Sequence, residues 1–163
     1  MLPLCRSVLA ACLAAFPVLG AGCAPAPGSP SPAGASALVR EAEAFMASYA
    51  NDLRAGARQN IVDRYDPRGV YFLGHGRKEL TPLDSVRASY LGRWSPPATF
   101  EWQDLSYEPA GPDAVVVIGR FVWGVSAERR FTYSYTGLLL RQDGRLRIRV
   151  EDESSAPERP ASP

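Results

Sequence analysis

The stretch "RLRIRVEDESS", Arg145–Ser155, decides the fold, because it has the pattern of a strand that closes a sheet. Leu146, Ile148 and Val150 alternate with arginine and glutamate, as in a strand with one buried and one solvated face. The next position on the apolar face is Asp152. An acid at that position indicates either that the strand enters water there or that the carboxylate points into a cavity.

Three further strands are predicted before this one. The runs "TFEWQDLSYEP", "DAVVVIGRFVWGV" and "ERRFTYSYTGLLLRQ" are apolar or alternating and are separated by short turns. The tripeptide "QDG", 142–144, is a hairpin signal that leads into the closing strand. Gly119, Gly124 and Gly137 stand inside these strands, where glycine permits sharp bends. We therefore expect four antiparallel strands in a strongly curved sheet.

The first half of the body is predicted to be mainly helical. From Ala37, with Ser36 as the N-cap, apolar residues recur at spacings of three and four until Gly56 ends the helix. The stripe consists of Leu38, Ala42, Phe45, Met46, Tyr49 and Leu53. A short helical piece over 60–64 follows.

A strand over 70–73, "VYFL", and a glycine-bracketed loop, "GHGRKE", lead into a second amphipathic helix. Thr81 is its expected N-cap and Pro82 its first residue. Helices followed by an antiparallel sheet predict an α+β fold, in which the helices cover one face of a strongly curved, cone-shaped sheet and leave a conical hollow.

The N-terminus has the pattern of a secretory signal. Arg6 precedes an apolar stretch over 8–19, and small residues then lead to Cys23. The sequence "LGAGC" resembles a bacterial lipoprotein processing site, which implies lipidation of Cys23 and anchoring in the cell envelope. The alternative is a plain cleaved signal in which Cys23 has no role. We therefore expect a signal peptide over 1–22, a Pro/Ala/Gly/Ser tether over 23–36, a folded domain over 37–155 and a disordered tail over 156–163.

Composition argues against several function classes. The chain has 163 residues and a formal net charge of +1, and its basic residues are scattered, so nucleic-acid binding is not expected. All three cysteines lie in the first 23 residues and there is one histidine. We therefore expect no disulfide in the body of the protein, no metal site of the usual composition and no cofactor.

The segments "DLRAG", "YDPRGVYFLG" and "RQDGRLRIRVEDESS" resemble those of the nuclear transport factor 2-like superfamily. The similarity is strongest to its SnoaL-like branch, which includes ketosteroid isomerases and polyketide cyclases, and it covers roughly Ala37 to Ser155. Leu146 stands where an aromatic residue is common, and Asp152 stands where many relatives carry a histidine.

This resemblance implies a pocket on the concave face with candidate catalytic residues inside it. Asp152 is the first candidate for a general base, with its pKa raised by burial, and Tyr135 is the matching phenol. Further pocket-lining residues are expected to be Tyr65, Tyr71, Trp102, Asp104, Trp123 and Tyr133. The alternatives are that Asp152 is a solvated strand end, that Asp104 pairs with an arginine and that the aromatic residues only pack. Arg120 either pairs with an acid or lies on the solvent or dimer face, and His75 is expected in an exposed loop.

Three functions remain open. The first is binding of a small, largely apolar molecule by an exported, lipid-anchored bacterial domain. The second is an isomerase or cyclase that uses Asp152 and a tyrosine without a cofactor. The third is a non-catalytic assembly module of the cell envelope that forms a homodimer through its sheet face.

Overall fold

The computed structural model describes residues 31–74 and 77–155. The predicted signal peptide, Cys23, His75 and the tail over 156–163 lie outside these residues. The elements are α1 (Pro32–Ala55), α2 (Arg58–Val62), β1 (Val70–Gly74), β2 (Arg77–Thr81), α3 (Leu83–Gly92), β3 (Thr99–Gly111), β4 (Ala114–Gly124), β5 (Arg130–Gln142) and β6 (Arg145–Ser155). The strands form one sheet in the order β2-β1-β6-β5-β4-β3.

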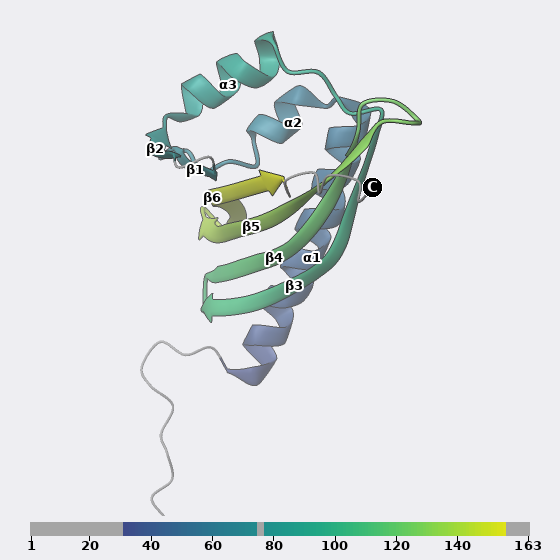
Figure 1. Cartoon of the computed structure of the whole chain (residues 1–163). Helices are drawn as coiled ribbons and strands as arrows, with labels where there is room; N and C mark the ends of the chain where they lie inside the picture. Colours follow the sequence, from purple (N-terminus) through teal and green to yellow (C-terminus); the bar gives the residue numbers. More distant parts are fainter. Residues whose placement is uncertain (1–30, 75–76, 156–163) are drawn as a thin grey trace, which may run out of the picture.

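The sheet is strongly curved and does not close into a barrel, and α1 packs along its inner face (Figure 1). The long strands β3 to β6 pair antiparallel, whereas β1 runs parallel to β6. The expected α+β architecture is therefore confirmed. Within the described ranges, no helix combines the length and apolar character needed to cross a membrane.

The core lies between α1 and the inner face of the sheet. Its members include Leu38, Met46 and Leu53 of α1, Val115, Val117 and Phe121 of β4, Leu139 of β5, and Leu146 and Ile148 of β6. The predicted stripe of α1 is buried as expected, except for Phe45, which is half-buried. Burial of this stripe holds the helix against the sheet.

Helix α1 begins earlier than the sequence predicts. Ser31 is its N-cap, with a side-chain oxygen that accepts a hydrogen bond from the Gly34 amide at 3.1 Å, and Pro32 is the first helical residue. Ser36, the predicted cap, lies inside the helix and donates to the carbonyl of Pro32 at 3.0 Å. The end at Gly56 is confirmed, because this residue adopts a φ of 65°, which glycine accommodates at little cost.

The predicted loop before the second long helix contains a strand. Residues Arg77–Thr81 form β2 and pair antiparallel with β1. Thr81 therefore ends a strand and does not cap α3, whose N-cap is Pro82. The polar composition of this edge strand hid its pairing from a search for apolar alternation.

A bulge in β6 changes which acid faces the interior. The pairing of β5 with β6 shifts register beside Arg149, which is an extra residue in β6. Ile148 before the bulge and Glu151 after it are both buried, because one extra residue reverses the alternation of a strand. Asp152 consequently pairs beside the exposed Thr136 on the opposite face. The prediction that Asp152 continues the inward row is wrong.

A second bulge, in β3, moves Asp104, the other acid predicted to face the pocket, to the outer face of the sheet. The pairing of β3 with β4 shifts at Asp104, which adopts a φ of 51°, and Leu105 takes the inward position. Gly119 lies opposite, where a Cβ atom would approach the Leu105 side chain to 2.6 Å. Asp104 forms an exposed ion pair with Arg120. The alternative that Asp104 pairs with an arginine is confirmed, and its placement in the pocket is wrong.

Candidate functional site

Glu151 is the carboxyl that the fold buries on the inner face of the sheet. Only 3% of the residue is exposed. The Tyr65 hydroxyl donates to its Oε2 atom at 2.9 Å. No sequence pattern singled out Glu151, because in regular alternation it shares a face with Arg147 and Arg149.

The Tyr65 hydroxyl is the centre of a network of phenols. It lies 3.1 Å from the Tyr49 hydroxyl of α1 and 2.9 Å from the Tyr90 hydroxyl of α3. With its one proton donated to Glu151, its oxygen accepts from the other two phenols. Phenols from α1, from α3 and from the segment after α2 are thus linked, through Tyr65, to one carboxyl on β6.

A fourth phenol approaches the same carboxyl from β5. Tyr135 is 1% exposed, and its ring lies over Gly137, where a Cβ atom would come within 2.5 Å of the hydroxyl. Gly137 itself pairs with Glu151. The Tyr135 hydroxyl and the Oε1 atom of Glu151 are both buried without a hydrogen-bond partner among the described residues. Buried polar atoms of this kind are rare in native proteins and require an explanation.

The surroundings shift the acidity of these groups. Burial, assisted by the negative charge of Glu153, raises the pKa of Glu151 to about 8, and the nearby Tyr65 and Tyr135 hydroxyls oppose the shift. Part of Glu153 is exposed, yet the protein around its carboxyl and the charge of Asp152 raise its pKa to about 7. Burial also raises the pKa of the Tyr49, Tyr65 and Tyr135 phenols well above the ordinary value. The carboxyls are therefore the groups that can exchange protons near neutral pH.

Two adjoining hollows open beside this network. One, of about 380 Å³, is lined by Phe72, Leu73, Glu79, Thr81, Tyr133, Glu151 and Glu153. We call it the acidic hollow. The other, of about 340 Å³, is lined by Tyr49, Leu53, Tyr90, Trp94, Phe100, Trp102, Phe121, Trp123, Tyr133 and Glu153. We call it the aromatic hollow. Tyr133 and Glu153 belong to both linings, so the two hollows adjoin, and their volumes suit a small molecule.

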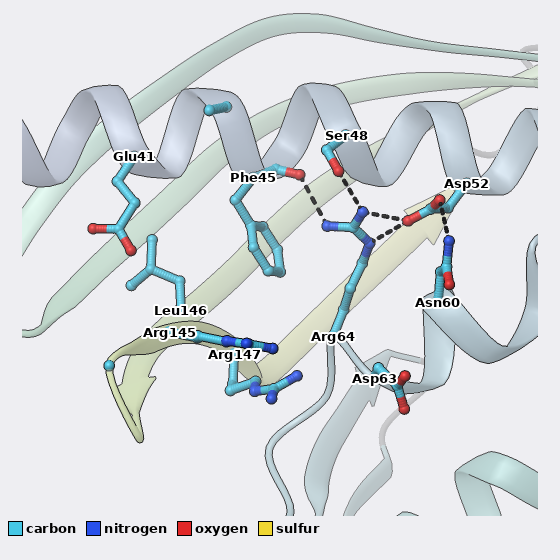
Figure 2. Close-up of a pocket in the computed structure, with 12 residues that line it drawn as sticks. Glu41, Phe45, Ser48, Asp52, Asn60, Asp63, Arg64, Arg145, Leu146 and Arg147 are labelled. Atoms are coloured by element: carbon cyan, nitrogen blue, oxygen red, sulfur yellow. Dashed lines mark hydrogen bonds and ion pairs between the residues drawn. The ribbon is translucent and has the colours of Figure 1, made fainter.

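Arg64, the residue before Tyr65, binds to α1 and so fixes the position of Tyr65 at the centre of the phenol network. Its guanidinium donates to Ser48 Oγ at 2.6 Å, to the Phe45 carbonyl at 3.3 Å and to Asp52 Oδ2 at 2.9 Å (Figure 2). The next residue is Tyr65, and its backbone bridges to Ile148 of β6. The arginine therefore fixes the segment that carries the Tyr65 hydroxyl.

The side chains around this arginine, between α1, α2 and the start of β6, line a groove (Figure 2). Its volume is about 540 Å³. Although it is the larger space, it is open, and Asp52, Arg64 and Glu41 on its wall are engaged in ion pairs. The groups with shifted pKa values near neutrality lie at the acidic hollow. We therefore assign the candidate site to the paired hollows.

The residues predicted to line a pocket are distributed among three places. Trp102, Trp123 and Tyr133 line the aromatic hollow, and Tyr65 lies in the buried network. Tyr71 lies on the outer face, with the Arg149 guanidinium 5.1 Å from the centre of its ring.

Of the predicted catalytic pair, Tyr135 lies next to the buried carboxyl, and its catalytic role stays a prediction. Asp152 is separated from it by the sheet and accepts a hydrogen bond from the nearby Ser154 hydroxyl at 3.2 Å.

Sequence reasoning missed Glu151, Glu153, Glu79 and Tyr90, and it assigned Tyr49 only to the apolar stripe of the first helix. Two acids at alternate positions of one strand, Glu151 and Glu153, were the available signal. Across 31–74 and 77–155, no group of three or more histidine, cysteine, aspartate or glutamate side chains is arranged to hold a metal ion.

No family model and no curated protein matches the chain, but solved structures do. An NTF-2 like protein of unknown function from Shewanella oneidensis superposes with a TM-score of 0.64 at 14% identity, over 72% of this chain and 98% of the other. The domain has the NTF-2-like fold.

Two further solved structures superpose on the same fold. A proposed scytalone dehydratase from Novosphingobium aromaticivorans gives a TM-score of 0.62 at 11% identity, over 78% of this chain and 89% of the other. A proposed ketosteroid isomerase from Parabacteroides distasonis gives 0.58 at 16% identity, over 69% and 86%. At these identities the similarity establishes the fold, and the chemistry has to be argued from the site.

Proposed function

We propose that this domain binds a small, largely apolar molecule in the paired hollows and moves protons on it without a cofactor, with Glu151 as the acid–base group. The observation that carries the proposal is the buried Glu151 carboxyl, which accepts from Tyr65 at 2.9 Å and borders an accessible hollow. General acid–base catalysis of this kind needs a carboxyl and a phenol that lie within hydrogen-bond reach of each other at one site.

The pKa of Glu151, raised to about 8, suits this role. Near neutral pH the carboxyl is present in both protonation states, so it can take a proton from one atom of a substrate and return it to another. The neighbouring phenols keep their protons, because burial raises the pKa of each. A protonated phenol can donate to an oxygen on which negative charge develops during the reaction.

The type of reaction follows from what the site can supply. It offers a proton acceptor, proton donors and an aromatic wall, which suffice for the shift of a double bond or the loss of water next to a carbonyl group. The names of two structural neighbours, a proposed dehydratase and a proposed isomerase, denote reactions of this type. Similarity to the SnoaL-like and ketosteroid isomerase-like branch supports the same reading for this chain.

Binding without catalysis is the second candidate. It is favoured by the depth of Glu151, which is 3% exposed and whose Oε2 atom is already occupied by Tyr65. Under this reading Oε1 and the Tyr135 hydroxyl only recognise a polar group of the ligand. An assembly module receives less support, because two hollows stand open on the inner side, although Ile118 is 46% exposed on the outer sheet face. A homodimer through that face stays a prediction.

The experiment that separates the first two candidates is proton exchange in heavy water. The protein is incubated with small aryl ketones, with and without an amino group, and deuterium incorporation next to the carbonyl is followed by NMR. Glu151→Gln is expected to lower the exchange rate by about 100-fold or more, since general base catalysis contributes that much. Asp152→Asn, on the opposite face of the same strand, is the matched control. Unchanged exchange in Glu151→Gln would exclude catalysis by this carboxyl, and tryptophan fluorescence would then report binding alone.

We also propose that the domain is exported and anchored at the cell envelope through a lipid on Cys23. The proposal is supported by the signal-like segment over 1–22 and by the Pro-, Ala-, Gly- and Ser-rich sequence that follows it.

A further inference from the structure

Three carboxyls line the acidic hollow from two different strands. Phe72 of β1 pairs with Glu79 of β2 on one side and with Glu151 of β6 on the other. Cross-strand partners share a face of the sheet, so the two acids flank the phenyl ring of Phe72. Glu153 follows two positions after Glu151 on the same face, and all three acids belong to the lining.

The described lining of this hollow carries acids and no base. The Oε1 atom of Glu151 is buried and has no hydrogen-bond partner among the described residues, so it can accept from a ligand. In agreement, burial and the charge of Glu153 raise the pKa of Glu151 to about 8, and loss of water around its carboxyl together with the Asp152 charge raises the pKa of Glu153 to about 7. A bound positive charge would lower both pKa values.

The arrangement suits an organic cation better than a metal ion. The described residues hold no group of three acids close enough to ligate one ion. The carboxyls instead surround a space that Phe72 and Tyr133 also line, and aromatic faces attract ammonium groups. Beyond Tyr133 and Glu153 the aromatic hollow continues, with Trp94, Trp102 and Trp123 in its wall. The acidic and aromatic spaces thus adjoin in one site.

We propose that the ligand of this site is an apolar amine, whose ammonium group lies among Glu79, Glu151 and Glu153 and whose apolar body occupies the aromatic hollow. This inference rests on the proposed function, since it names the substrate class for the same hollows. It adds a role for Glu79 and Glu153, which the proton-transfer proposal does not require. A bound ammonium also favours ionised Glu151, the form that accepts a proton.

The test compares three probes with the same aromatic body. Phenethylamine, phenethyl alcohol and phenylacetate carry a positive, neutral and negative group, and binding is measured by calorimetry and by the fluorescence of the tryptophans in the aromatic hollow. Phenethylamine is expected to bind about tenfold tighter than the alcohol, since hydrogen bonds between an ammonium group and carboxylates are stronger than those of a neutral hydroxyl. Phenylacetate is expected to bind most weakly, because the carboxyls repel it.

Single substitutions test whether the acids of the acidic hollow cause the preference for the amine. Glu79→Gln and Glu153→Gln, both at exposed residues, are each expected to reduce the preference for the amine at least about threefold without unfolding the domain. Asp152→Asn removes one negative charge from the opposite face of β6 and is expected to leave the preference within about twofold.

The outcomes distinguish the two proposals. If the alcohol binds as tightly as the amine, the cation inference is wrong and the small-molecule site remains. If none of the three probes perturbs the tryptophans or binds, both fail. If the amine is preferred equally in wild type, Glu79→Gln and Glu153→Gln, the preference arises outside this hollow and the inference is overturned.

Discussion

At the scale of single residues, Glu151 sets how the stability of the domain depends on pH. Its pKa in the folded protein, about 8, lies above the ordinary value of 4.5. The folded state therefore keeps a proton that the unfolded chain releases. The stability that results is fully present below pH 4.5 and is lost as the pH rises through about 8. Glu153, with its pKa raised to about 7, contributes with the same sign.

We therefore expect Glu151→Gln to flatten this dependence. The Tm of the wild type should fall between about pH 5 and pH 8.5, and the fall should be smaller in the variant by about 5 °C, as expected for a change of ~1–2 kcal/mol in a domain of this size. Thermal unfolding followed by circular dichroism measures it. Glu101→Gln, an exposed residue paired with Arg130, is the control and should retain the wild-type slope. A variant at Glu151 with an unchanged slope would show that the buried carboxyl does not carry the extra proton.

At the scale of elements, the close approach of Tyr135 and Gly137 decides how β5 serves the site. A Cβ atom on Gly137 would lie 2.5 Å from the Tyr135 hydroxyl and 2.9 Å from its ring. Gly137→Ala is therefore expected to cost about 1–3 kcal/mol, because overpacking forces a buried ring out of place. Chemical denaturation measures the loss. Gly92→Ala is the control, since no atom lies within 4 Å of the added Cβ atom, and it should be neutral or slightly stabilising. Equal stability of Gly137→Ala and wild type would contradict the packing described for Tyr135.

The start of α1 gives a second prediction at this scale. Ser31→Ala removes the side-chain acceptor for the Gly34 amide and should lower the free energy of unfolding by about 1 kcal/mol. Ser36→Ala, at the position that the sequence favours as the cap, should change it by less than about 0.5 kcal/mol, because Ser36 lies inside the helix. Urea unfolding of both variants distinguishes a helix capped by Ser31 from one capped by Ser36. A larger loss of stability in Ser36→Ala than in Ser31→Ala would indicate that the helix begins after Ser36.

The elements also explain how far the sequence could predict the site. Apolar alternation located the four long strands, and glycine located the end of α1, because these signals are local. The faces of β3 and β6 could not be predicted beyond Asp104 and Arg149, because each bulge depends on a partner strand. Both acids chosen from regular alternation consequently face outward, while Glu151 faces inward. The phenol network was equally hidden, since its members meet only through tertiary packing.

At the scale of the whole molecule, one carboxyl connects the helices to the sheet. Tyr65, which follows α2, joins Tyr49 of α1 and Tyr90 of α3 to Glu151 of β6 in a branched hydrogen-bond network. A buried polar network of this kind specifies a single arrangement when its bonds are satisfied. The paired hollows lie where these elements converge. Tyr49, Tyr90 and Glu151 thus belong both to the network that joins the elements and to the lining of the hollows.

The position of the molecule in the cell gives the last prediction. If Cys23 carries a lipid, Cys23→Ser should move the protein from the membrane fraction to the soluble fraction of a bacterial host that exports it, since the variant lacks the proposed lipid anchor. Cys12→Ser, inside the apolar part of the signal, is the matched control and should stay with the membranes. Fractionation with detection by antibody measures both, and incorporation of a labelled fatty acid should be lost only in Cys23→Ser. Wild-type protein that is soluble after export would contradict the anchor and leave a plain cleaved signal, with Cys23 having no role.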